Sequence, residues 1–386
     1  MVEFEQPEII LLTHEFYPLQ GGISTFCQEL ALSLRRRDCE VEIWGPSVAK
    51  LPEPLARFGC HLCSLPIPAD HGFQATLGMA KALRRNLPRK RNTVVVIAEP
   101  GPLRAYFLAF RNTPSPDHRL WIILHGSEIL RGRKNPLWKW PLQFCLTRAT
   151  LVGTVSAFNR ELIQSHFPGC GEKVRVLPMG PSSEIREAAS TYARAEQKKK
   201  PPWQILTVAR IHPRKGQDLV LRALALLPAE IRQDVVYRIV GGGRRKSYLR
   251  KIKNLAQKSG VRVQFTGPLD EKALWEEYAR ADFFIMTSRQ YRRSVEGFGL
   301  VYLEAGCFGL PSIAARSGGV ADAVLDGQTG VLVEEGKVMD IRDALERFCT
   351  DSRFRLDLGR GAREYSMKRT WDSVAAQFLE STLPGM

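Results

Sequence analysis

The chain opens with an apolar strand, a glycine turn and an amphipathic helix, and this alternation recurs along most of its length. Residues 8–18 read "EIILLTHEFYP", residues 19–22 read "LQGG" and residues 23–37 read "ISTFCQELALSLRRR", after which "CEVEIWG" supplies the next strand. Strands that alternate with helices indicate a parallel sheet covered by helices on both faces. Such a sheet binds ligands at the carboxyl ends of its strands.

The alternation forms two series. The first ends at "KVRVLPMG", a charged stretch without strand character covers residues 181–202, and a second series begins at "WQILTVARIH". A chain of 386 residues is also longer than a typical single domain. We therefore predict an α/β protein with two similar domains, over residues 1–182 and 183–364.

The composition excludes several classes of protein. With 44% hydrophobic and 25% charged residues the chain resembles an ordinary globular protein, and no apolar run reaches the roughly 18 to 20 residues that a membrane span needs. The acidic start "MVEFEQPEII" is unlike a secretory signal, so we expect a cytoplasmic protein. Cys60 and Cys63 form a lone CxxC, and without a second pair ordinary packing is favoured over a zinc or redox role.

The formal net charge of +16 points to an anionic partner, which could be a phosphate ester, a nucleic acid or a membrane. Residues 81–148 hold 14 Lys and Arg but 3 Asp and Glu. Within them, "RGRKNPLWKWPLQF" mixes basic and aromatic side chains in a way that suits an anionic bilayer surface. A solvated basic face with buried tryptophans is an equal alternative. The residues concerned are Arg131, Arg133, Lys134, Trp138, Lys139 and Trp140.

Five motifs carry a resemblance to a known family. In chain order they are "YPLQGGISTF", "LHGSE", "VSAF", "ARIHPRKGQDL" and "EGFGLVYLEAGCFGLPSIAARSGGVADAV". Together they resemble the retaining glycosyltransferases of family 4, and "ARIHPRKGQD" with "TSRQYRRSVEGFGLVYLEA" is most similar to the phosphatidylinositol mannosyltransferases. The resemblance implies the GT-B fold, in which two Rossmann-like domains face each other across a deep cleft. The first domain would bind the acceptor and the second the nucleotide-sugar donor.

The resemblance also implies a place for the end of the chain. The segment 365–386 contains "YSMKRTWDSVAAQFLESTLPGM", which predicts an amphipathic helix. In the family such a helix crosses back to pack on the N-terminal domain. The alternative is a helix that stays on the second domain.

A basic turn is the first candidate for donor binding. The donor's diphosphate leaves during the reaction and must be neutralised, and the sequence holds no DxD motif that would bind a metal for this purpose. We therefore expect no metal and no cofactor besides the nucleotide-sugar. Arg210 and Lys215 lie five residues apart across a turn with Pro213 and Gly216, and the resemblance assigns both to the diphosphate.

Two glutamates at E-x7-E spacing form the second candidate. Glycines after Glu296 let the backbone approach a ligand, and the helix that begins there favours a phosphate at its N-terminus. By resemblance, Glu304 binds the ribose and Glu296 contacts hydroxyls of the donor sugar. The expected donor-binding residues of this segment are Glu296, Gly297, Phe298, Gly299, Leu300 and Glu304.

Other glycine loops complete the expected site. By resemblance, Gly21 and Gly22 approach the donor's distal phosphate, and His125 of "LHGSE" hydrogen-bonds a sugar hydroxyl near the reaction centre. Gly242 of "VGGGRRK" and Pro268 of "FTGPLD" would border the nucleotide. Family members often carry an arginine where this chain has Pro268.

The leading hypothesis is a retaining, metal-independent hexosyltransferase that moves mannose from GDP-mannose to a lipid-linked or glycan acceptor, with the protein peripherally bound at the cytoplasmic face of the membrane. The alternative within the fold uses UDP-glucose or another UDP-sugar. Among other classes of protein, a nucleic-acid-binding protein would also fit the positive charge, although the sequence contains no nucleic-acid-binding motif. An inactive nucleotide-sugar sensor is a third possibility. The oligomeric state stays open.

Overall fold

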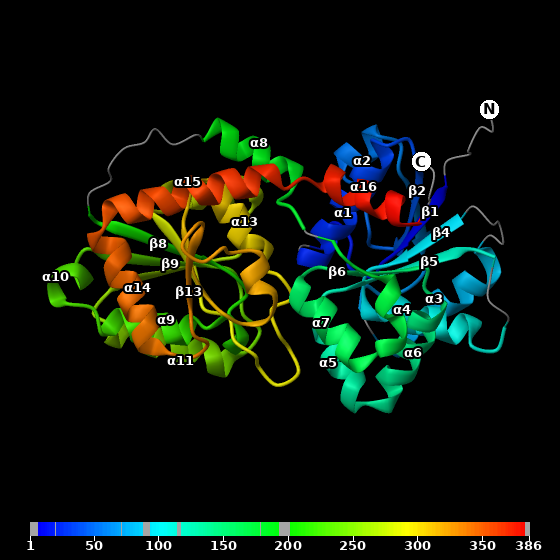
Figure 1. Ribbon diagram of the computed structural model, residues 1–386, viewed down its shortest axis with the longest axis horizontal. Helices are drawn as coiled ribbons and strands as arrows, with labels where there is room; N and C mark the ends of the chain where they lie inside the picture. Colours follow the sequence, from blue (N-terminus) through cyan, green and yellow to red (C-terminus); the bar gives the residue numbers. More distant parts are fainter. Residues whose placement is uncertain are drawn as a thin grey trace. The chain divides into compact units, whose positions relative to one another are not determined.

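The computed structural model describes residues 7–19, 21–70, 72–87, 93–113, 117–177, 179–192 and 201–382 (Figure 1). The chain divides into two compact units. Unit 1 comprises Met1–Met179 with Trp371–Met386, and unit 2 comprises Gly180–Thr370. Within the described parts of the chain, no helix is both long and apolar enough to cross a membrane.

Unit 1 is built on a parallel sheet with the strand order β3-β2-β1-β4-β5-β6-β7. Its central strand β4 is "TVVVI" and is buried throughout, because a parallel strand with helices on both faces has no solvent side. The strands are β1 (Glu8–Leu12), β2 (Glu40–Pro46), β3 (His61–Leu65), β4 (Thr93–Ile97), β5 (Arg119–Leu124), β6 (Leu151–Thr154) and β7 (Val174–Val176).

Two layers of helices cover this sheet. Helices α1, α2 and α16 form one layer, and α3, α4, α5 and α6 form the other (Figure 1). The helices are α1 (Gly22–Arg35), α2 (Glu53–Arg57), α3 (Phe73–Asn86), α4 (Pro100–Phe110), α5 (Ser127–Lys134), α6 (Pro136–Arg148), α7 (Ala157–His166), the 3₁₀ helix η1 (Pro168–Lys173) and α16 (Trp371–Thr382).

Unit 2 repeats the plan with the strand order β10-β9-β8-β11-β12-β13, again with parallel pairing throughout. The strands are β8 (Trp203–Val208), β9 (Val235–Val240), β10 (Arg262–Gly267), β11 (Phe283–Met286), β12 (Ser312–Ala315) and β13 (Gly330–Val333). The helices are α8 (Ser183–Thr191), η2 (Pro213–Lys215), α9 (Gln217–Ala225), α10 (Ala229–Arg232), α11 (Lys246–Lys258), α12 (Glu271–Arg280), α13 (Leu300–Cys307), η3 (Gly318–Asp322), α14 (Val338–Thr350) and α15 (Ser352–Lys368).

The predicted α/β class with two parallel sheets is confirmed. The segment expected between the domains contains helix α8, and residues 193–200 lie outside the described residues. The chain passes between the units at Met179/Gly180 and again at Thr370/Trp371. Gly180 packs on the backbone of the second crossing, since a Cβ at Gly180 would lie 2.9 Å from the Arg369 carbonyl oxygen.

The segment expected as one helix over 365–386 is two helices. Helix α15 ends at Lys368 in unit 2, and α16 begins at Trp371 and belongs to unit 1. Aromatic side chains hold α16 in place, because Trp371 meets the Phe26 ring edge-on at 5.4 Å between centroids and Phe378 packs on Trp121 at 4.9 Å.

All eight cysteines are free, and Cys60 is buried just before β3, where burial raises the pKa of its thiol to about 11.

Candidate active site

The strand order of unit 2 reverses between β8 and β11, and the loops after these two paired strands hold most of the expected donor-binding residues. The loop after β8 carries Arg210 and the short helix η2 (Pro213–Lys215). The loop after β11 runs through Ser288 to Glu296. Since neighbouring loops diverge at such a reversal, a crevice at the carboxyl ends of the strands is the usual ligand site of an open α/β sheet.

A buried ion cluster joins the two loops. Oxygen Oε2 of Glu296 accepts from Lys215 Nζ at 2.6 Å, from Arg214 Nη1 at 2.8 Å and from the Ser288 hydroxyl at 3.1 Å. The side chains of the three charged residues are 10 to 12% exposed. Burial by itself would raise the pKa of Glu296, but Lys215 and Arg214 outweigh it and lower the pKa to about 2. Burial lowers the pKa of Lys215, and Glu296 opposes that shift.

A glycine at the end of η2 allows this close approach of the loops. Gly216 has φ +73°, which an L side chain rarely adopts, and a Cβ there would lie 2.0 Å from the carbonyl oxygen of Thr287. The Thr287 hydroxyl donates to the Gly216 carbonyl at 3.2 Å, so the backbones are locked together. Lys215 therefore reaches Glu296 because its turn sits directly on the end of β11.

Arg289 braces the same turn from the second loop. Its Nε donates to the Pro213 carbonyl at 2.9 Å, and its backbone amide donates to the Arg214 carbonyl at 2.8 Å. Its Nη2 contacts both carboxylate oxygens of Asp218, at 3.0 and 3.2 Å. Asp218 lies in the first turn of α9, is buried, and also pairs with Lys251 of α11 at 2.8 Å. Sequence analysis identified neither Arg289 nor Asp218 as part of the site.

Glu304 lies in helix α13, which follows the left-handed Gly299 at φ +97°. Tyr278 donates to its Oε2 at 2.8 Å, while Oε1 accepts no hydrogen bond from the described residues. Burial raises the pKa of Glu304, and the Tyr278 hydroxyl and Lys215 oppose the shift. Phe298 is buried before the helix, and Gly297 and Leu300 are partly exposed on either side of it.

Arg210 and Lys215, which sequence analysis assigned together to the diphosphate, have different surroundings in the structure. Lys215 joins Glu296 as described, whereas Arg210 is exposed and forms no ion pair with the described residues. Arg214, which precedes Lys215 in the same motif, occupies the cluster instead. Gly242 and Pro268 lie side by side after β9 and β10, since a Cβ on Gly242 would stand 3.3 Å from Pro268 Cγ. The Gly242 carbonyl accepts from the Ile211 amide at 2.7 Å, which ties this loop to the one with Arg210.

In unit 1, His125 lies directly after β5, as the strand pattern predicts. Carboxylate oxygen Oε1 of Glu128 accepts from the backbone amides of His125 and Gly126 and so fixes the loop. The imidazole packs edge-on against Phe26 at 5.3 Å and bonds the backbone of Ala98, while its Nε2 has no partner among the described residues. Burial lowers the pKa of His125, and Glu128 opposes that shift.

Two further loops of unit 1, after β4 and before α1, carry a buried carboxylate and the expected glycines. Glu99 is buried after β4, where its Oε1 accepts from the Thr13 hydroxyl at 2.7 Å and from the Glu15 amide at 3.1 Å. Sequence analysis missed Glu99, although it stands at the end of the apolar run "TVVVIAE". Gly21 and Gly22 are exposed, and a Cβ at either would meet no atom within 4 Å, which leaves room for a ligand group beside them.

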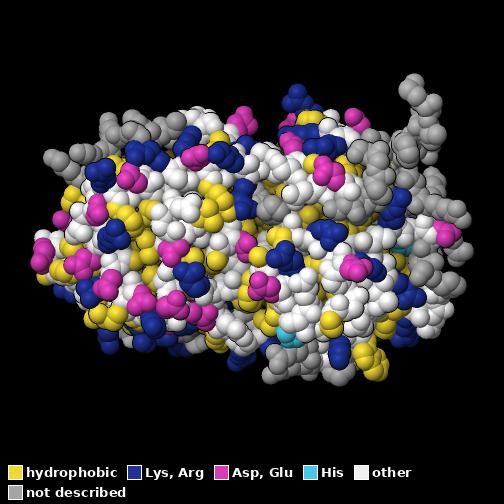
Figure 2. Space-filling model, in the orientation of Figure 1, with side chains coloured by type: hydrophobic (Ala, Val, Ile, Leu, Met, Phe, Trp, Pro, Cys, Tyr) yellow, Lys and Arg dark blue, Asp and Glu magenta, His cyan; other side chains and the backbone are white. Residues whose placement is uncertain are grey.

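The basic, aromatic segment forms most of α5 and α6 in unit 1. Leu137 and Trp140 are 81% and 70% exposed, Arg131 of α5 and Lys139 of α6 are also exposed, and Trp138 is covered by Arg104, whose guanidinium stands 4.6 Å from the ring. The side chains of Arg133 and Lys134 lie outside the described residues. The visible face of the molecule mixes basic, acidic and hydrophobic side chains (Figure 2).

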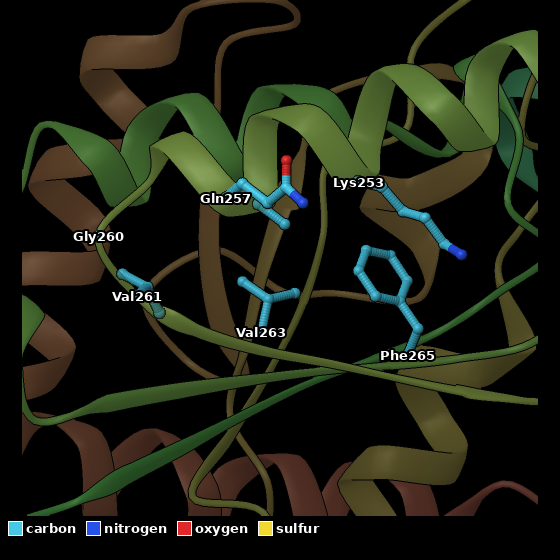
Figure 3. A pocket seen from close by; sticks show the side chains of 7 residues that line it. Lys253, Gln257, Gly260, Val261, Val263 and Phe265 are labelled. Carbon is cyan, nitrogen blue, oxygen red and sulfur yellow. The ribbon is translucent and has the colours of Figure 1, made fainter.

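A shallow groove of about 350 Å³ lies between α11 and β10, away from the ion cluster. Figure 3 shows Lys253 and Gln257 of the helix above Val261, Val263 and Phe265. Its lining is largely apolar and brings no set of polar groups together, so it offers no chemistry for a phosphorylated ligand. Among the described residues, no three His, Cys, Asp or Glu side chains are grouped to hold a metal ion.

Comparisons with known proteins show the family of this chain. Residues 20–183 match the family model "Glycosyltransferase Family 4", and residues 189–365 match "Glycosyl transferases group 1". The chain is similar to a GDP-mannose-dependent alpha-(1-6)-phosphatidylinositol monomannoside mannosyltransferase of Mycobacterium tuberculosis, at 32% identity over 96% of this chain and 97% of the relative. The Mycolicibacterium smegmatis protein of the same name is 29% identical over the same shares.

Solved structures share the fold at lower identity. Sucrose-phosphate synthase of Thermosynechococcus elongatus superposes with a TM-score of 0.76 at 20% identity, covering 97% of each chain. Anabaena HepE in complex with UDP and glucose gives a TM-score of 0.76 at 18% identity, covering 99% of this chain and 100% of that one. With both halves matched, the chain belongs to glycosyltransferase family 4: it is a GT-B enzyme of two Rossmann-like domains that uses a nucleotide-sugar donor, and it is similar to the phosphatidylinositol mannosyltransferases.

Proposed function

We propose that this enzyme is a retaining, metal-independent mannosyltransferase that transfers mannose from GDP-mannose to a lipid-linked or glycan acceptor at the cytoplasmic face of a membrane. The cluster of Arg214, Lys215 and Glu296 at the strand reversal of unit 2 carries the proposal. Its buried positive charge lies at the strand reversal and supports the proposal that a diphosphate binds there. The names of the relatives supply the choice of mannose and of GDP.

The cluster supports donor binding without a metal. A lysine ammonium has three protons, so Lys215 can keep its bond to Glu296 and still donate to a phosphate oxygen. Arg210 is exposed and forms no ion pair with the described residues, so it can approach the other phosphate. Fixed donors in a partly buried site stabilise the charge that develops on the leaving diphosphate. We assign to Glu296 contacts with the mannose hydroxyls, and to Glu304, through Oε1, a hydrogen bond from the ribose.

The proposed reaction is a same-face substitution. The bond between the mannose C1 and the phosphate oxygen breaks, and its electron pair stays on that oxygen. The acceptor hydroxyl forms the new bond to C1 on the same face and passes its proton to the departing phosphate. Arg210, Arg214 and Lys215 stabilise the released GDP. His125 holds a sugar hydroxyl through its Nε2, which has no partner among the described residues. A glycosyl-enzyme adduct detected by mass spectrometry would rule out this route.

Membrane association is proposed from the exposed side chains of unit 1. Leu137 and Trp140 present apolar surface, and the exposed Arg131 and Lys139 of the same segment would attract anionic lipid headgroups. Flotation with phosphatidylglycerol vesicles should recover the wild-type protein, and Leu137→Ala/Trp140→Ala should stay in the dense fraction. Equal flotation of both proteins would remove this surface from the proposal.

Nucleotide titration tests the donor assignment. Calorimetry with GDP, UDP and ADP, each with EDTA, should show binding of GDP to wild type, and Glu304→Ala should weaken it at least about tenfold because a ribose hydrogen bond to a charged group is lost. Glu276→Ala is the matched control, since Glu276 is an exposed glutamate of α12. Binding of UDP in place of GDP would support a UDP-sugar donor. Binding of nucleic acid with no nucleotide would overturn the proposal.

A further inference from the structure

The loop between β11 and α13 contains a tight hairpin with two exposed arginines. The Tyr291 amide donates to the Ser294 carbonyl at 2.9 Å, and the Ser294 amide returns the bond at 3.0 Å. Arg292 and Arg293 form the tip and are exposed, and Arg292 has φ +57°. A residue other than glycine seldom adopts this conformation, and such residues cluster at active sites and ligand clamps.

Tyr291 is the centre of a cluster of cations. Arg245, in the loop after β9, donates from Nη1 to the Tyr291 hydroxyl at 2.9 Å, and this bond, followed by the nearby charge of Arg245 and Arg292, lowers the pKa of Tyr291. The guanidiniums of Arg245 and Arg292 stand 5.3 and 5.6 Å from the Tyr291 ring centroid. His212 meets the same ring edge-on at 5.4 Å. Two loops therefore direct positive groups to one side chain.

This cluster adjoins the donor-binding residues. His212 precedes η2, and its Nδ1 accepts the backbone amide of Arg214 at 3.1 Å. Burial lowers the pKa of His212, and the charges of Arg245, Arg214, Arg210 and Lys215 lower it further. The same imidazole thus lies within electrostatic reach of both the hairpin cluster and the residues assigned to the diphosphate.

The positive charge here exceeds what the donor needs. Glu296 balances part of the charge of Arg214 and Lys215. A nucleotide-sugar diphosphate carries one negative charge on each phosphate, which Lys215 and Arg210 can meet. Among the described residues, no carboxylate pairs with Arg245 or Arg292, and Glu335, in the loop after β13, accepts the Gln290 amide at 2.9 Å. Unpaired arginines in this density attract a further anionic group.

We infer that Arg245, Tyr291 and Arg292 form a second phosphate-binding subsite in unit 2, which holds the phosphate group of the acceptor. This inference rests on the proposed function, in which the acceptor hydroxyl must come close to the donor sugar. The two guanidiniums bind the phosphate oxygens in a fork, and the Tyr291 hydroxyl orients Arg245. The chemistry recognised is a phosphate monoester or diester, whether it belongs to a lipid headgroup or to a soluble molecule.

The test compares acceptors that differ in their phosphate. Arg245→Gln/Arg292→Gln is assayed with GDP-mannose and three acceptors: phosphatidylinositol monomannoside in phosphatidylcholine vesicles, the deacylated glycerophosphoinositol monomannoside, and methyl α-mannoside, which has no phosphate. The control is Arg262→Gln/Arg353→Gln, which removes the same charge from two exposed arginines that make no hydrogen bond or ion pair with the described residues.

The expected result is a KM at least about tenfold higher for both phosphorylated acceptors, because charge-assisted hydrogen bonds are lost. The KM for methyl α-mannoside, the Kd for GDP and the behaviour of the control stay within about twofold of wild type. A higher KM for both phosphorylated acceptors shows that the free headgroup is sufficient for recognition. A higher KM for the vesicle acceptor alone would show that the phosphate is recognised only as part of the lipid. A weaker Kd for GDP would assign the arginines to the donor and overturn the inference, as would an unchanged KM for every acceptor.

Failure of the proposed function is detected separately, from the activity of the wild-type enzyme with GDP-mannose. If wild type shows no turnover with GDP-mannose, the donor proposal fails, and the subsite is then tested by calorimetric titration of inositol 1-phosphate into protein saturated with the nucleotide that binds. Binding by wild type and by the control, with at least about tenfold weaker binding by Arg245→Gln/Arg292→Gln, supports the subsite. Equal binding by all three proteins overturns it.

Discussion

At the scale of single residues, Glu296 is the carboxylate on which the proposed donor site depends, because three hydrogen-bond donors meet one of its oxygens. An unpaired charge in this position would be costly to bury. The ion cluster therefore serves two purposes, since it makes a buried glutamate tolerable and holds two cations where the diphosphate is proposed to bind. Both purposes can be measured.

The first prediction concerns pH. The pKa of Glu296 is lowered from the ordinary 4.5 to about 2, so the ionised carboxylate stabilises the folded state above about pH 4.5 and this contribution is lost as the pH falls toward 2. Urea unfolding should show Glu296→Gln less stable than wild type at pH 7, with the difference shrinking at pH 3. The control Glu276→Gln should differ little from wild type at either pH. A gap for Glu296→Gln that stays constant with pH would contradict the lowered pKa.

The second prediction separates two costs of a side chain at Gly216. Both Gly216 (φ +73°) and Gly327 (φ +70°) have left-handed backbones, but a Cβ at Gly216 would lie 2.0 Å from the Thr287 carbonyl oxygen and one at Gly327 would meet no atom within 4 Å. Gly327→Ala should therefore lose only about 1 kcal/mol of stability, the usual cost of the strained backbone. Gly216→Ala should lose more and should also weaken nucleotide binding. Equal losses in thermal unfolding would show that the loops can separate at no cost.

At the scale of elements, the loops after β8 and β11 act as one structure because Arg289 bridges them to helix α9. Arg289 touches no proposed ligand, so its role is to position η2. A planar guanidinium can bond a carbonyl through Nε and a carboxylate through Nη2 together, which a lysine cannot do. The position of Lys215 should therefore depend on the planar shape of the Arg289 guanidinium as well as on the positive charge of Arg289.

The third prediction follows from this brace. Arg289→Gln should weaken GDP binding about tenfold and Arg289→Lys should restore only part of it, in calorimetric titrations. The control Arg316→Gln removes an exposed ion pair with Asp326 in the same unit and should change neither binding nor stability much. Full recovery in Arg289→Lys would show that charge alone is needed, and unchanged GDP affinity in Arg289→Gln would remove Arg289 from the positioning role.

Local signals in the sequence were enough to predict the strands, the glycine turns and the position of His125 after β5, because each depends on a few neighbouring residues. The placement of Lys215 and Glu296 in unit 2 also followed from their motifs. The pairing of Arg214 with Glu296 was not predicted, since it joins residues 82 positions apart. Arg289, Asp218 and Glu99 were missed for the same reason: each makes its contacts across the sheet or between loops, and no short spacing marks them.

At the scale of the whole molecule, unit 1 is built from both ends of the chain, and unit 2 is built from the residues between them. Helix α16, at the C-terminal end, therefore completes unit 1. Phe378 and Trp121 are both fully buried, with ring centroids 4.9 Å apart. Since residues 371–382 supply part of the covering of the unit 1 sheet, we expect the last helix to contribute to the stability of unit 1.

The fourth prediction tests that dependence. Phe378→Ala should lower the stability of unit 1 by about 3 to 5 kcal/mol, the usual cost of removing a buried phenylalanine. Phe73→Ala is the control, because Phe73 of α3 is 74% exposed in the same unit. Scanning calorimetry should show a lower unfolding temperature for Phe378→Ala alone. Matching temperatures for the two variants would mean that α16 adds little to unit 1.

The stereochemistry of the product, measured without metal, tests the central proposal most directly. The enzyme is incubated with GDP-α-mannose, methyl α-mannoside and EDTA, and the one-bond C1–H1 coupling of the new mannosyl residue is recorded by NMR. The account predicts an α-linked product formed at the same rate with or without EDTA. A β-linked product, or a reaction that stops in EDTA and resumes with a divalent cation, would contradict the retaining, metal-independent mechanism.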